Sequence, residues 1–488
     1  MKKLVSVVCL TALVFFALVV VAQIGCKAAK SDELPITTKS KEARKLFVEG
    51  LDLYDFYHLE KASDRFKRAF EIDPDFATAY LFHAVTTTET KDFQASLAKA
   101  IELAPRVSEG EQKLIAAVKA NAEENNAEKA ARIFKELSAL YPKDKRIHLY
   151  LAGMYGGLNK YDDQLAEIEQ AIAIDKNYAP AHEALGYFYR WRGPLDKSEA
   201  AFKEYARLSP GEANSHDVLG DVYMKMGRFE DAIKHYEEAV RMDPSFFYSQ
   251  QKTGSCLSFL GRYEDARQAF SKAMDLPVKP VNKVYDQEGI VRTYIYEGDY
   301  PKALEAADKA IQMAKDLGLP EEASYTPLVK SFVYCELGDF EKADAAIGEC
   351  LGYLDSADLI ESIKSNQRCA ATFMKSMVAA RRNDFETALA QAASFKDQIA
   401  AINNPAIQKQ PGWLLGCIAL AQGDANKAIE YFSQGEMDDV FIMYQYAAAK
   451  EMAGDAAGAA ELYKKVATWN LDGAWYAFVR GKAAAKLQ

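Results

Sequence analysis

Residues 214–244 read NSHDVLGDVYMKMGRFEDAIKHYEEAVRMDP, and this stretch decides the fold. Small residues at Gly220 and Ala232 allow two antiparallel helices to approach closely, and Gly227 permits a turn between them. The proline at the end stops the second helix because it cannot donate the next helical hydrogen bond. The stretch therefore predicts a helical hairpin, and the question is whether His216 is a chemical group or part of the packing.

The pattern recurs along the chain, which is the signature of stacked structural repeats. Its turn residues are Asn159, Gly193, Gly227, Gly261, Gly298, Gly338, Asn383, Gly423 and Gly454. The first four lie 34 residues apart, and the later spacings vary between 31 and 45 residues. One hairpin cannot bury its apolar face alone, so consecutive hairpins are expected to stack on one another.

The repeat resembles the tetratricopeptide repeat, whose pattern is L-G-x2-Y, then A-x3-F, then a closing proline. Residues 213–246 carry this pattern almost completely, and residues 43–76 carry it through Gly50, Ala62 and Phe66. The resemblance implies an all-α fold, a right-handed superhelical solenoid of about twelve helical hairpins. No segment predicts a strand.

The same reading divides the chain into six segments. They are an export or lipoprotein signal at 1–25, a polar linker at 26–40, a regular repeat array at 41–276, a proline-rich hinge at 277–283, longer and divergent hairpins at 284–467, and a C-terminal capping helix at 468–488.

Two lysines and an apolar run from Leu4 to Ala22 open the chain, which is typical of an export signal. The following Ile-Gly-Cys resembles a bacterial lipoprotein box, and this implies lipidation at Cys26. The expected location is the cell envelope, facing the periplasm or the surface and anchored by lipid. Lys27, rather than an aspartate, follows the cysteine and favours the outer membrane. An uncleaved membrane anchor is the alternative, because the run is long enough to span a bilayer.

Charge and cysteine content limit the possible partners. Without residues 1–25 the chain carries a formal charge of −12, so nucleic acid is not an expected partner. The cysteines beyond Cys26 form no CxxC pair, and they are expected to be buried free thiols, although one pair could form in an oxidising compartment. They are Cys256, Cys335, Cys350, Cys369 and Cys417.

His216 belongs to a periodic set with His148 and His182, each 34 residues from the next. Stacked helices lie ~8–10 Å apart, whereas nitrogens that share a zinc ion each lie within ~2.1 Å of it. We therefore interpret these histidines as rings at the interfaces between hairpins and predict no metal site. Ser108 and Glu111 have the spacing of a helix-capping box.

No catalytic motif emerges from the sequence. It contains no GxxxxGK[ST], GxGxxG, GxSxG or HExxH, and its acidic residues fit the solvated faces of helices. We therefore predict no enzymatic activity and no cofactor. An all-helical enzyme with carboxylates that meet across hairpins is the least favoured reading.

The remaining candidate for function is a binding surface. In the family that the chain resembles, the first helix of each hairpin lines a concave groove, and this implies a binding surface for a peptide or protein partner. The implied groove residues are Tyr187, Arg190, Trp191, Asn214, Asp217, Asp221, Lys225, Tyr248, Gln251, Phe259, Arg292 and Tyr296. The lysine and asparagine that chaperone-binding members use to hold a terminal carboxylate are missing.

The favoured function is a non-enzymatic scaffold for protein–protein interaction, lipid-anchored outside the cytoplasm. A glycan-binding surface lipoprotein is the first alternative, because one family of starch-binding lipoproteins builds on these repeats. A sensory or regulatory repeat module is the second, because residues 205–232 look like repeat tails found on bacterial membrane-bound kinases and transcription regulators.

Overall fold

The computed structural model confirms the all-α class. It describes residues 32–87, 89–276, 279–359, 361–402, 407–434 and 437–488. Within these ranges the chain forms twelve antiparallel helical hairpins followed by one further helix, with no strand. The chain divides into two compact units, one ending at Ser209 and the other beginning at Pro210.

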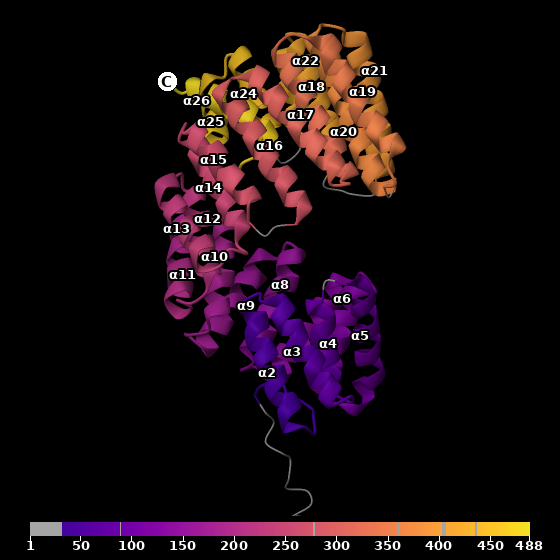
Figure 1. Cartoon of the computed structure of the whole chain (residues 1–488), viewed down its shortest axis with the longest axis vertical. Helices are drawn as coiled ribbons and strands as arrows, with labels where there is room; N and C mark the ends of the chain where they lie inside the picture. Colours follow the sequence, from indigo (N-terminus) through magenta and orange to yellow (C-terminus); the bar gives the residue numbers. More distant parts are fainter. Residues whose placement is uncertain (1–31, 88, 277–278, 360, 403–406, 435–436) are drawn as a thin grey trace, which may run out of the picture. The chain divides into compact units, whose positions relative to one another are not determined.

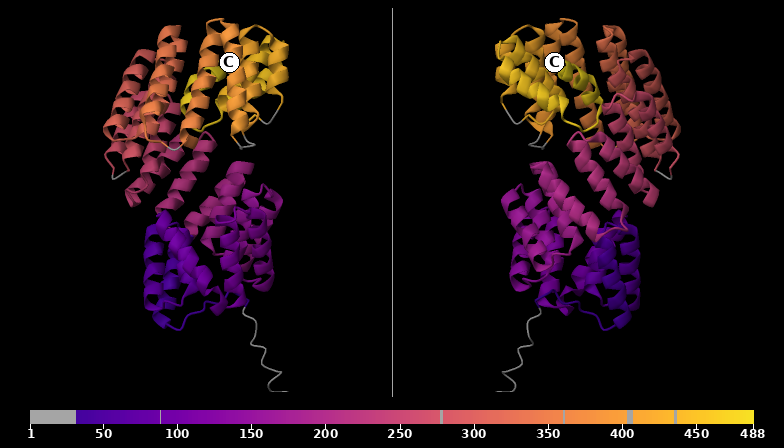
Figure 2. Two further views of the ribbon diagram at one scale, coloured as in Figure 1. Left: turned by 90° about the vertical axis from the view of Figure 1, so that its right-hand side faces the viewer. Right: turned by 90° about the vertical axis from the view of Figure 1, so that its left-hand side faces the viewer.

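Unit 1 contains five hairpins that stack in chain order (Figures 1 and 2). Its helices are α2 (Lys41–Asp55), α3 (Leu59–Ile72), α4 (Ala77–Thr86), α5 (Thr90–Leu103), α6 (Glu109–Ala122), α7 (Ala127–Leu140), α8 (Lys145–Gly157), α9 (Tyr161–Ile174), α10 (Ala179–Arg192) and α11 (Leu195–Leu208), with a 3-10 turn η1 (Ala104–Arg106).

Unit 2 contains the other seven hairpins and the last helix. Its helices are α12 (Ala213–Lys225), α13 (Phe229–Met242), α14 (Phe247–Phe259), α15 (Tyr263–Met274), α16 (Pro280–Glu297), α17 (Tyr300–Asp316), α18 (Pro320–Glu336), α19 (Phe340–Ser356), α20 (Glu361–Arg381), α21 (Phe385–Ala401), α22 (Gln410–Ala421), α23 (Ala425–Phe432), α24 (Val440–Met452), α25 (Ala456–Ala467) and α26 (Ala474–Ala485).

The predicted turn residues are confirmed, because each has the positive φ that ends one helix and redirects the chain into the next. Glycine and asparagine adopt this conformation at low cost. The φ angles run from 58° at Asn159 to 87° at Gly454.

A glycine–aromatic contact fixes the distance between the two helices of a hairpin. A Cβ atom added at Gly220 would lie 2.5 Å from the ring of Tyr236, the fully buried aromatic residue of the partner helix. The same contact joins Gly186 to Phe202 and Gly254 to Phe270. Each aromatic ring therefore packs against bare helix backbone, and the small residue predicted from the repeat is required there.

The longer spacing in the second half appears as longer helices. Helices α16 to α21 have 17 to 21 residues, whereas α12 to α15 have 12 to 14. Helices α22 to α25 return to 8 to 13 residues. A hinge at 277–283 stays a prediction, because residues 277–278 lie outside the described ranges, and Pro280 is the first residue of α16.

The described part of the linker is held against unit 1. Thr37 N donates to Glu111 Oε1 at 2.8 Å, and Leu34 N donates to Asp144 Oδ2 at 3.0 Å. Glu111 also completes the predicted capping box, because the Ser108 hydroxyl accepts from Glu111 N and the Glu111 carboxylate accepts from Ser108 N. This carboxylate therefore joins the start of α6 to the segment that leads into α2.

Two further predictions can be compared with the described residues. The five cysteines are free and buried, as predicted. The signal segment and Cys26 lie outside the described ranges. No described helix is both long and apolar enough to cross a membrane.

Replacing Gly220 tests the glycine–aromatic contact. Gly220→Leu is expected to lower the free energy of unfolding by about 1–3 kcal/mol, because the new side chain overlaps the Tyr236 ring in a filled interface. Gly211→Leu is the matched control, since a Cβ there meets nothing within 4 Å, and it should change stability by less than about 0.5 kcal/mol. Urea unfolding followed by circular dichroism measures both, and equal destabilisation would contradict the contact.

Candidate functional site

A pocket of about 360 Å³ opens on unit 1 between the end of α2 and the helices α8 and α10. Aromatic residues dominate its walls, and its polar lining includes Asp55 and Glu183. Its aromatic lining residues are Tyr54, Tyr57, Tyr150, Tyr178, Tyr187, Phe188 and Trp191. The pocket thus brings two of the predicted groove residues, Tyr187 and Trp191, together with residues about 130 positions earlier in the chain.

Tyr57 is the pocket residue that the sequence reading missed. It occupies the turn between α2 and α3 with φ of 60°, where other hairpins have glycine or asparagine, and its side chain is 67% exposed. The signal was available, because Tyr57 follows Gly50 by seven residues, as Gly227 follows Gly220.

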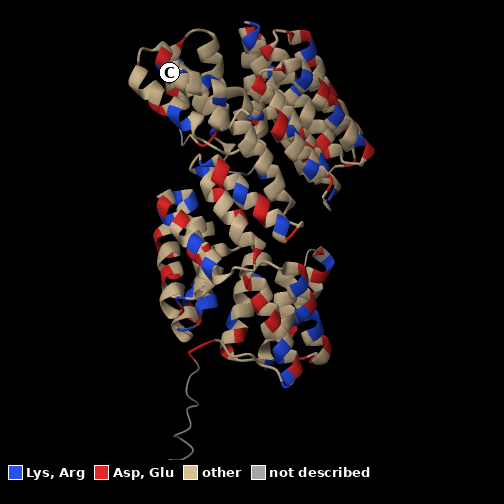
Figure 3. Ribbon diagram, turned by 60° about the vertical axis from the view of Figure 1, so that its left-hand side comes forward, with Lys and Arg blue, Asp and Glu red and all other residues tan. Residues whose placement is uncertain are grey.

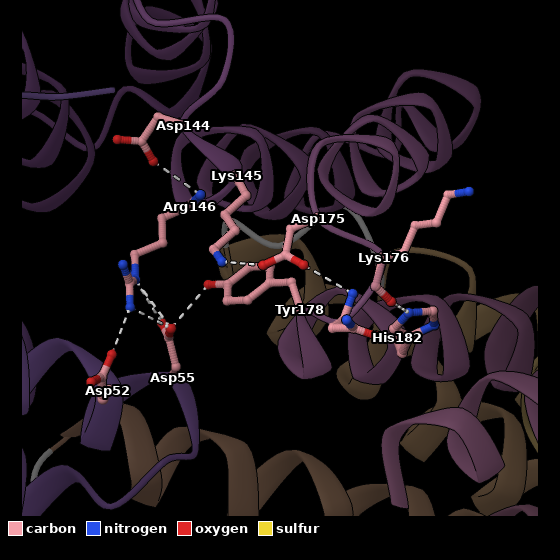
Figure 4. A network of polar contacts seen from close by, with 10 residues as sticks. Asp52, Asp55, Asp144, Lys145, Arg146, Asp175, Lys176, Tyr178 and His182 are labelled. Carbon is pink, nitrogen blue, oxygen red and sulfur yellow. Dashed lines mark hydrogen bonds and ion pairs between the residues drawn. The ribbon is translucent and has the colours of Figure 1, made fainter. Parts of the chain in front are cut away.

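An ion pair holds the end of α2 against α8 and α10 (Figure 4). Arg146 Nη2 lies 2.8 Å from Asp55 Oδ2 and 3.1 Å from Asp52 Oδ1. The Tyr178 hydroxyl donates to the same Asp55 oxygen at 3.1 Å. Burial lowers the pKa of Arg146, but the neighbouring Asp55 carboxylate raises it by more, so the guanidinium remains charged. This network positions Tyr54 and Tyr57 at the pocket.

A second set of contacts in Figure 4 orders the start of α10. Lys145 pairs with Asp175, and its ammonium group lies 4.5 Å from the centroid of the Tyr178 ring. The hydrogen bond from Lys145 is the largest cause of the lowered pKa of Asp175. His182 Nε2 lies 2.9 Å from the carbonyl oxygen of Lys176, which closes the turn before the helix. The ring of Tyr178 is thereby fixed as one wall of the pocket.

The last turn of α10 supplies the exposed rim. Trp191 is 59% exposed, and the Arg190 guanidinium lies 5.2 Å from its ring and 5.9 Å from the ring of Tyr187. Tyr187 itself packs edge-on against the buried Phe202, with ring centroids 5.3 Å apart. The rim therefore combines an anchored tyrosine with a tryptophan that stays in water.

In unit 2, two of the predicted groove carboxylates serve an internal ion network. Lys252 Nζ lies 2.9 Å from Asp217 Oδ2 and 2.7 Å from Asp221 Oδ1. The hydroxyl of the buried Tyr236 donates to Asp221 at 2.8 Å, and the Ser249 hydroxyl donates to Asp217 at 2.6 Å. These two carboxylates therefore link α12 to α14 and are already engaged within the chain.

The chain's own C-terminal segment contacts the predicted groove residues on α14 and α16. Asp472 Oδ2 accepts from Arg292 Nε at 2.9 Å and from the Ser255 hydroxyl at 2.8 Å. Asp472 Oδ1 accepts from the Tyr296 hydroxyl at 2.9 Å. Three side chains from two helices thus hold one carboxylate, in the manner expected for a bound peptide.

Aromatic rings of the C-terminal segment make further contacts with predicted groove residues. Tyr476 packs against the predicted groove residue Phe259, with ring centroids 5.7 Å apart, and Lys225 lies 5.1 Å from the ring centroid of Trp469. Helix α26 packs on α25, where a capping helix is expected, and also on α16 and α24. Lys225, Phe259 and the two α16 residues therefore contact a segment of this chain that lies far along the sequence.

The remaining predicted groove residues of unit 2 are Tyr248, Gln251 and Asn214. Tyr248 is 53% exposed and lines a surface depression of about 380 Å³ with Gln251 and Asp217. Asn214 is partly buried at the start of α12. Neither Tyr248 nor Gln251 belongs to the aromatic pocket of unit 1.

The periodic histidines make three different contacts. His148 Nδ1 lies 2.6 Å from Glu167 Oε2, His182 contacts the backbone as described above, and His216 Nδ1 lies 3.1 Å from His235 Nδ1. Across the described ranges, no group of three or more histidine, cysteine or acidic side chains could hold a metal ion. His216 is thus part of the packing between α12 and α13.

One family model matches a part of the chain. The family model described as "Tetratricopeptide repeat" matches residues 218–246, which contain most of α12 and all of α13. These residues form a tetratricopeptide repeat. Proteins of this family are in general non-enzymatic scaffolds for protein–protein interaction. A search of curated protein sequences finds no match.

Solved structures match parts of the chain at low identity. YrrB, described as "a TPR protein with an unusual peptide-binding site", is 22% identical, with 39% of this chain and 96% of that chain covered and a TM-score of 0.31. MamA is 22% identical over 34% of this chain and 90% of that chain, with a TM-score of 0.31. PilW, a "widely conserved type IV pilus biogenesis factor", is 15% identical over 42% and 95%, also with a TM-score of 0.31.

One buried carboxyl group of the repeat protein has an unusual environment. Asp286 of α16 is fully buried, and neither carboxyl oxygen has a hydrogen-bond partner among the described residues. Burial raises the pKa of Asp286 to about 7 from an ordinary 3.8, although the positive charge of Arg292 offsets part of the increase. The folded protein therefore keeps a proton on this group over a pH range in which the unfolded chain loses it.

This difference predicts how stability depends on pH. Because the folded pKa lies above the unfolded one, Asp286 lowers stability as pH rises from about 4 to 7, by up to about 4 kcal/mol at ~1.4 kcal/mol per pKa unit. Asp286→Asn removes the titration, so it should melt at a higher temperature than wild type at pH 8. The gain should shrink or vanish at pH 5, and a gain that is the same at both pH values would contradict the assignment.

Proposed function

We propose that this protein is a non-enzymatic scaffold that binds a peptide segment of a partner protein in the aromatic pocket of unit 1. The observation that carries the proposal is that Tyr57 and Trp191 stay largely in water on a face where neighbouring rings are packed. Large aromatic side chains that are fixed in place but exposed are the usual anchors of protein interfaces.

The side chains that form the pocket walls are also held in place by contacts within the chain. Asp55, Arg146 and Tyr178 hold its walls through partly buried contacts, so little side-chain freedom remains to be lost on binding. The turn conformation of Tyr57 costs more than a glycine would, and a ring kept there at such a cost points to a role other than folding.

The charges of the chain fit a protein partner. Figure 3 shows Lys and Arg interspersed with Asp and Glu along the helices of both units, a pattern typical of solvated helix faces. That the protein binds no nucleic acid stays a prediction from its net negative charge.

Export and lipid anchoring are part of the proposal. Its support is the sequence of residues 1–26, with two lysines, an apolar run and Cys26. In this proposal the lipid on Cys26 ties the protein to the cell envelope from outside the cytoplasm, with the outer membrane preferred. The repeat units would then present the pocket to a partner in the periplasm or at the surface.

Glycan binding is the second candidate, because exposed rings such as Trp191 and Tyr57 can also stack on sugar faces. The two candidates differ in the class of ligand that the pocket binds, a peptide or a glycan. Binding to a glycan array, lost in Trp191→Ala and without any crosslinked protein partner, would favour the glycan candidate.

Two substitutions in the pocket test the favoured function. Trp191→Ala and Tyr57→Gly are each expected to weaken binding of the partner, recovered by in-cell crosslinking and mass spectrometry, by about tenfold or more. Tyr57→Gly should leave the melting temperature unchanged or raise it slightly, because glycine adopts the positive φ of this turn without strain.

The matched control is Lys225→Ala, which alters contacts with the C-terminal segment of unit 2 and leaves the pocket of unit 1 intact. Partner binding equal to wild type in both pocket variants would exclude this pocket as the recognition surface. Loss of binding in Lys225→Ala alone would instead point to unit 2.

Metabolic labelling with an alkyne fatty acid tests the anchor. Wild type is expected to incorporate the label and Cys26→Ala to lose it, because the thiol of that residue is the proposed attachment point. Cys9→Ala is the control, since Cys9 lies inside the apolar run and should leave labelling unchanged. Equal labelling of wild type and Cys26→Ala would refute lipidation at this residue.

A further inference from the structure

A second cavity lies within unit 2 and takes no part in the proposed peptide binding. Its volume is about 470 Å³, and helices α18, α20, α21, α22, α24 and α26 contribute to its walls. The large apolar side chains of its walls include Phe332, Phe373, Phe395, Trp413, Phe441 and Trp475. Its size and apolar lining are those of sites that bind small molecules.

Ring contacts across the cavity walls keep it open. Phe373 packs edge-on against Phe395 with centroids 5.6 Å apart, and Trp475 lies 5.4 Å from Phe332 and 6.1 Å from Phe441. The C-terminal segment therefore supplies one wall but does not fill the space. The rings hold one another in place, so the side chains of one wall do not collapse into the cavity.

The charge of the lining selects among ligands. No lysine, arginine or histidine is among the described residues that line it, and its acidic group is Asp439. The Asp439 carboxylate caps α24 by accepting from Ile442 N at 2.9 Å. Burial raises the pKa of the Tyr325 phenol to about 12 and also raises that of the Cys369 thiol, so both are uncharged at neutral pH. Arg381 and Lys409 contact the lining rings of Phe332 and Trp413, but they are already paired with Glu336 and Asp438. An anionic ligand would therefore meet the Asp439 carboxylate without an unpaired cation in the lining.

Hydrogen-bonding groups are few and lie at the cavity's edge. Asn366 is exposed, and Gln410 and Asp439 are partly buried. One carboxylate and two side-chain amides supply several acceptor oxygens, so a ligand with a single donor group can be satisfied there while its remainder contacts rings. The apolar walls favour a ligand whose remaining surface is hydrocarbon.

We propose that this cavity binds an uncharged, largely apolar small molecule that carries one hydroxyl or amine donor. The site is separate from the pocket of unit 1, and the function proposed for that pocket does not depend on it. Binding here would give the protein a small-molecule ligand in addition to a protein partner.

The purified full-length protein can be tested with N-phenyl-1-naphthylamine, a neutral apolar dye with one N–H donor, by the fluorescence increase on binding. Decanol is expected to displace the dye at pH 8, and decanoate should need at least tenfold higher concentration, because it is ionised and would approach Asp439. Displacement at equal concentrations, or no saturable dye binding, would overturn the proposal.

A cavity-filling variant locates the site. Ala370 lines the cavity, so Ala370→Trp should weaken dye binding at least tenfold. Ala457→Trp is the matched control, because Ala457 is exposed on α25 and does not line the cavity. Dye affinity equal to wild type in folded Ala370→Trp would overturn the proposal. If Ala370→Trp does not fold, the comparison of decanol with decanoate on wild type still decides it.

Discussion

The contact between a helix glycine and an aromatic ring sets the geometry on which everything else depends. At Gly220 and Tyr236, a ring fills the space that a side chain would take, and the two helices of the hairpin approach until the ring meets backbone. The contact recurs at Gly254, so the neighbouring hairpins of unit 2 can stack regularly, and Gly186 makes the same contact in unit 1. The surfaces that carry the predicted groove residues in both units are built on that regularity.

Both units use contacts between distant parts of the chain on these faces, with different results. In unit 1, Arg146 and Tyr178 hold the end of α2 through Asp55, and the attachment leaves an aromatic pocket open beside it. In unit 2, Arg292 and Tyr296 hold Asp472, and the attached segment covers the groove positions that the repeat pattern assigned to a partner. The same chemistry, a carboxylate held by a guanidinium and a phenol, exposes a surface in one unit and covers it in the other.

The C-terminal segment that contacts these positions also forms part of the second cavity. Trp475 belongs to the attached segment, and its ring contacts Phe332 and Phe441 in the cavity wall. The C-terminal segment therefore has two roles in unit 2. It contacts predicted groove residues on α16, and it completes the wall of an apolar cavity. A segment that the sequence reading assigned only to capping has a wider structural role.

The sequence by itself determined the helices, the turns and the cap at Ser108, because each of these depends on residues within a few positions of one another. The turn at Gly227 depends only on the φ angle of that residue. Gly220 and Tyr236, which form the close contact, are sixteen positions apart within one hairpin. The repeat register also predicted that Tyr187 and Trp191 lie on one surface, and both line the aromatic pocket of unit 1. Tyr57 could have been found in the same way, as a tyrosine at a turn position.

Only the tertiary structure decided which of the groove residues stay exposed. Arg292 and Tyr296 meet Asp472 across 180 and 176 residues, and Tyr178 meets Asp55 across 123. The repeat register fixes the face on which a side chain lies, but it carries no information about which distant segment returns to that face. That outcome depends on the summed rotation of many hairpins and on the charge and shape of the returning segment, which become visible only when the hairpins are stacked.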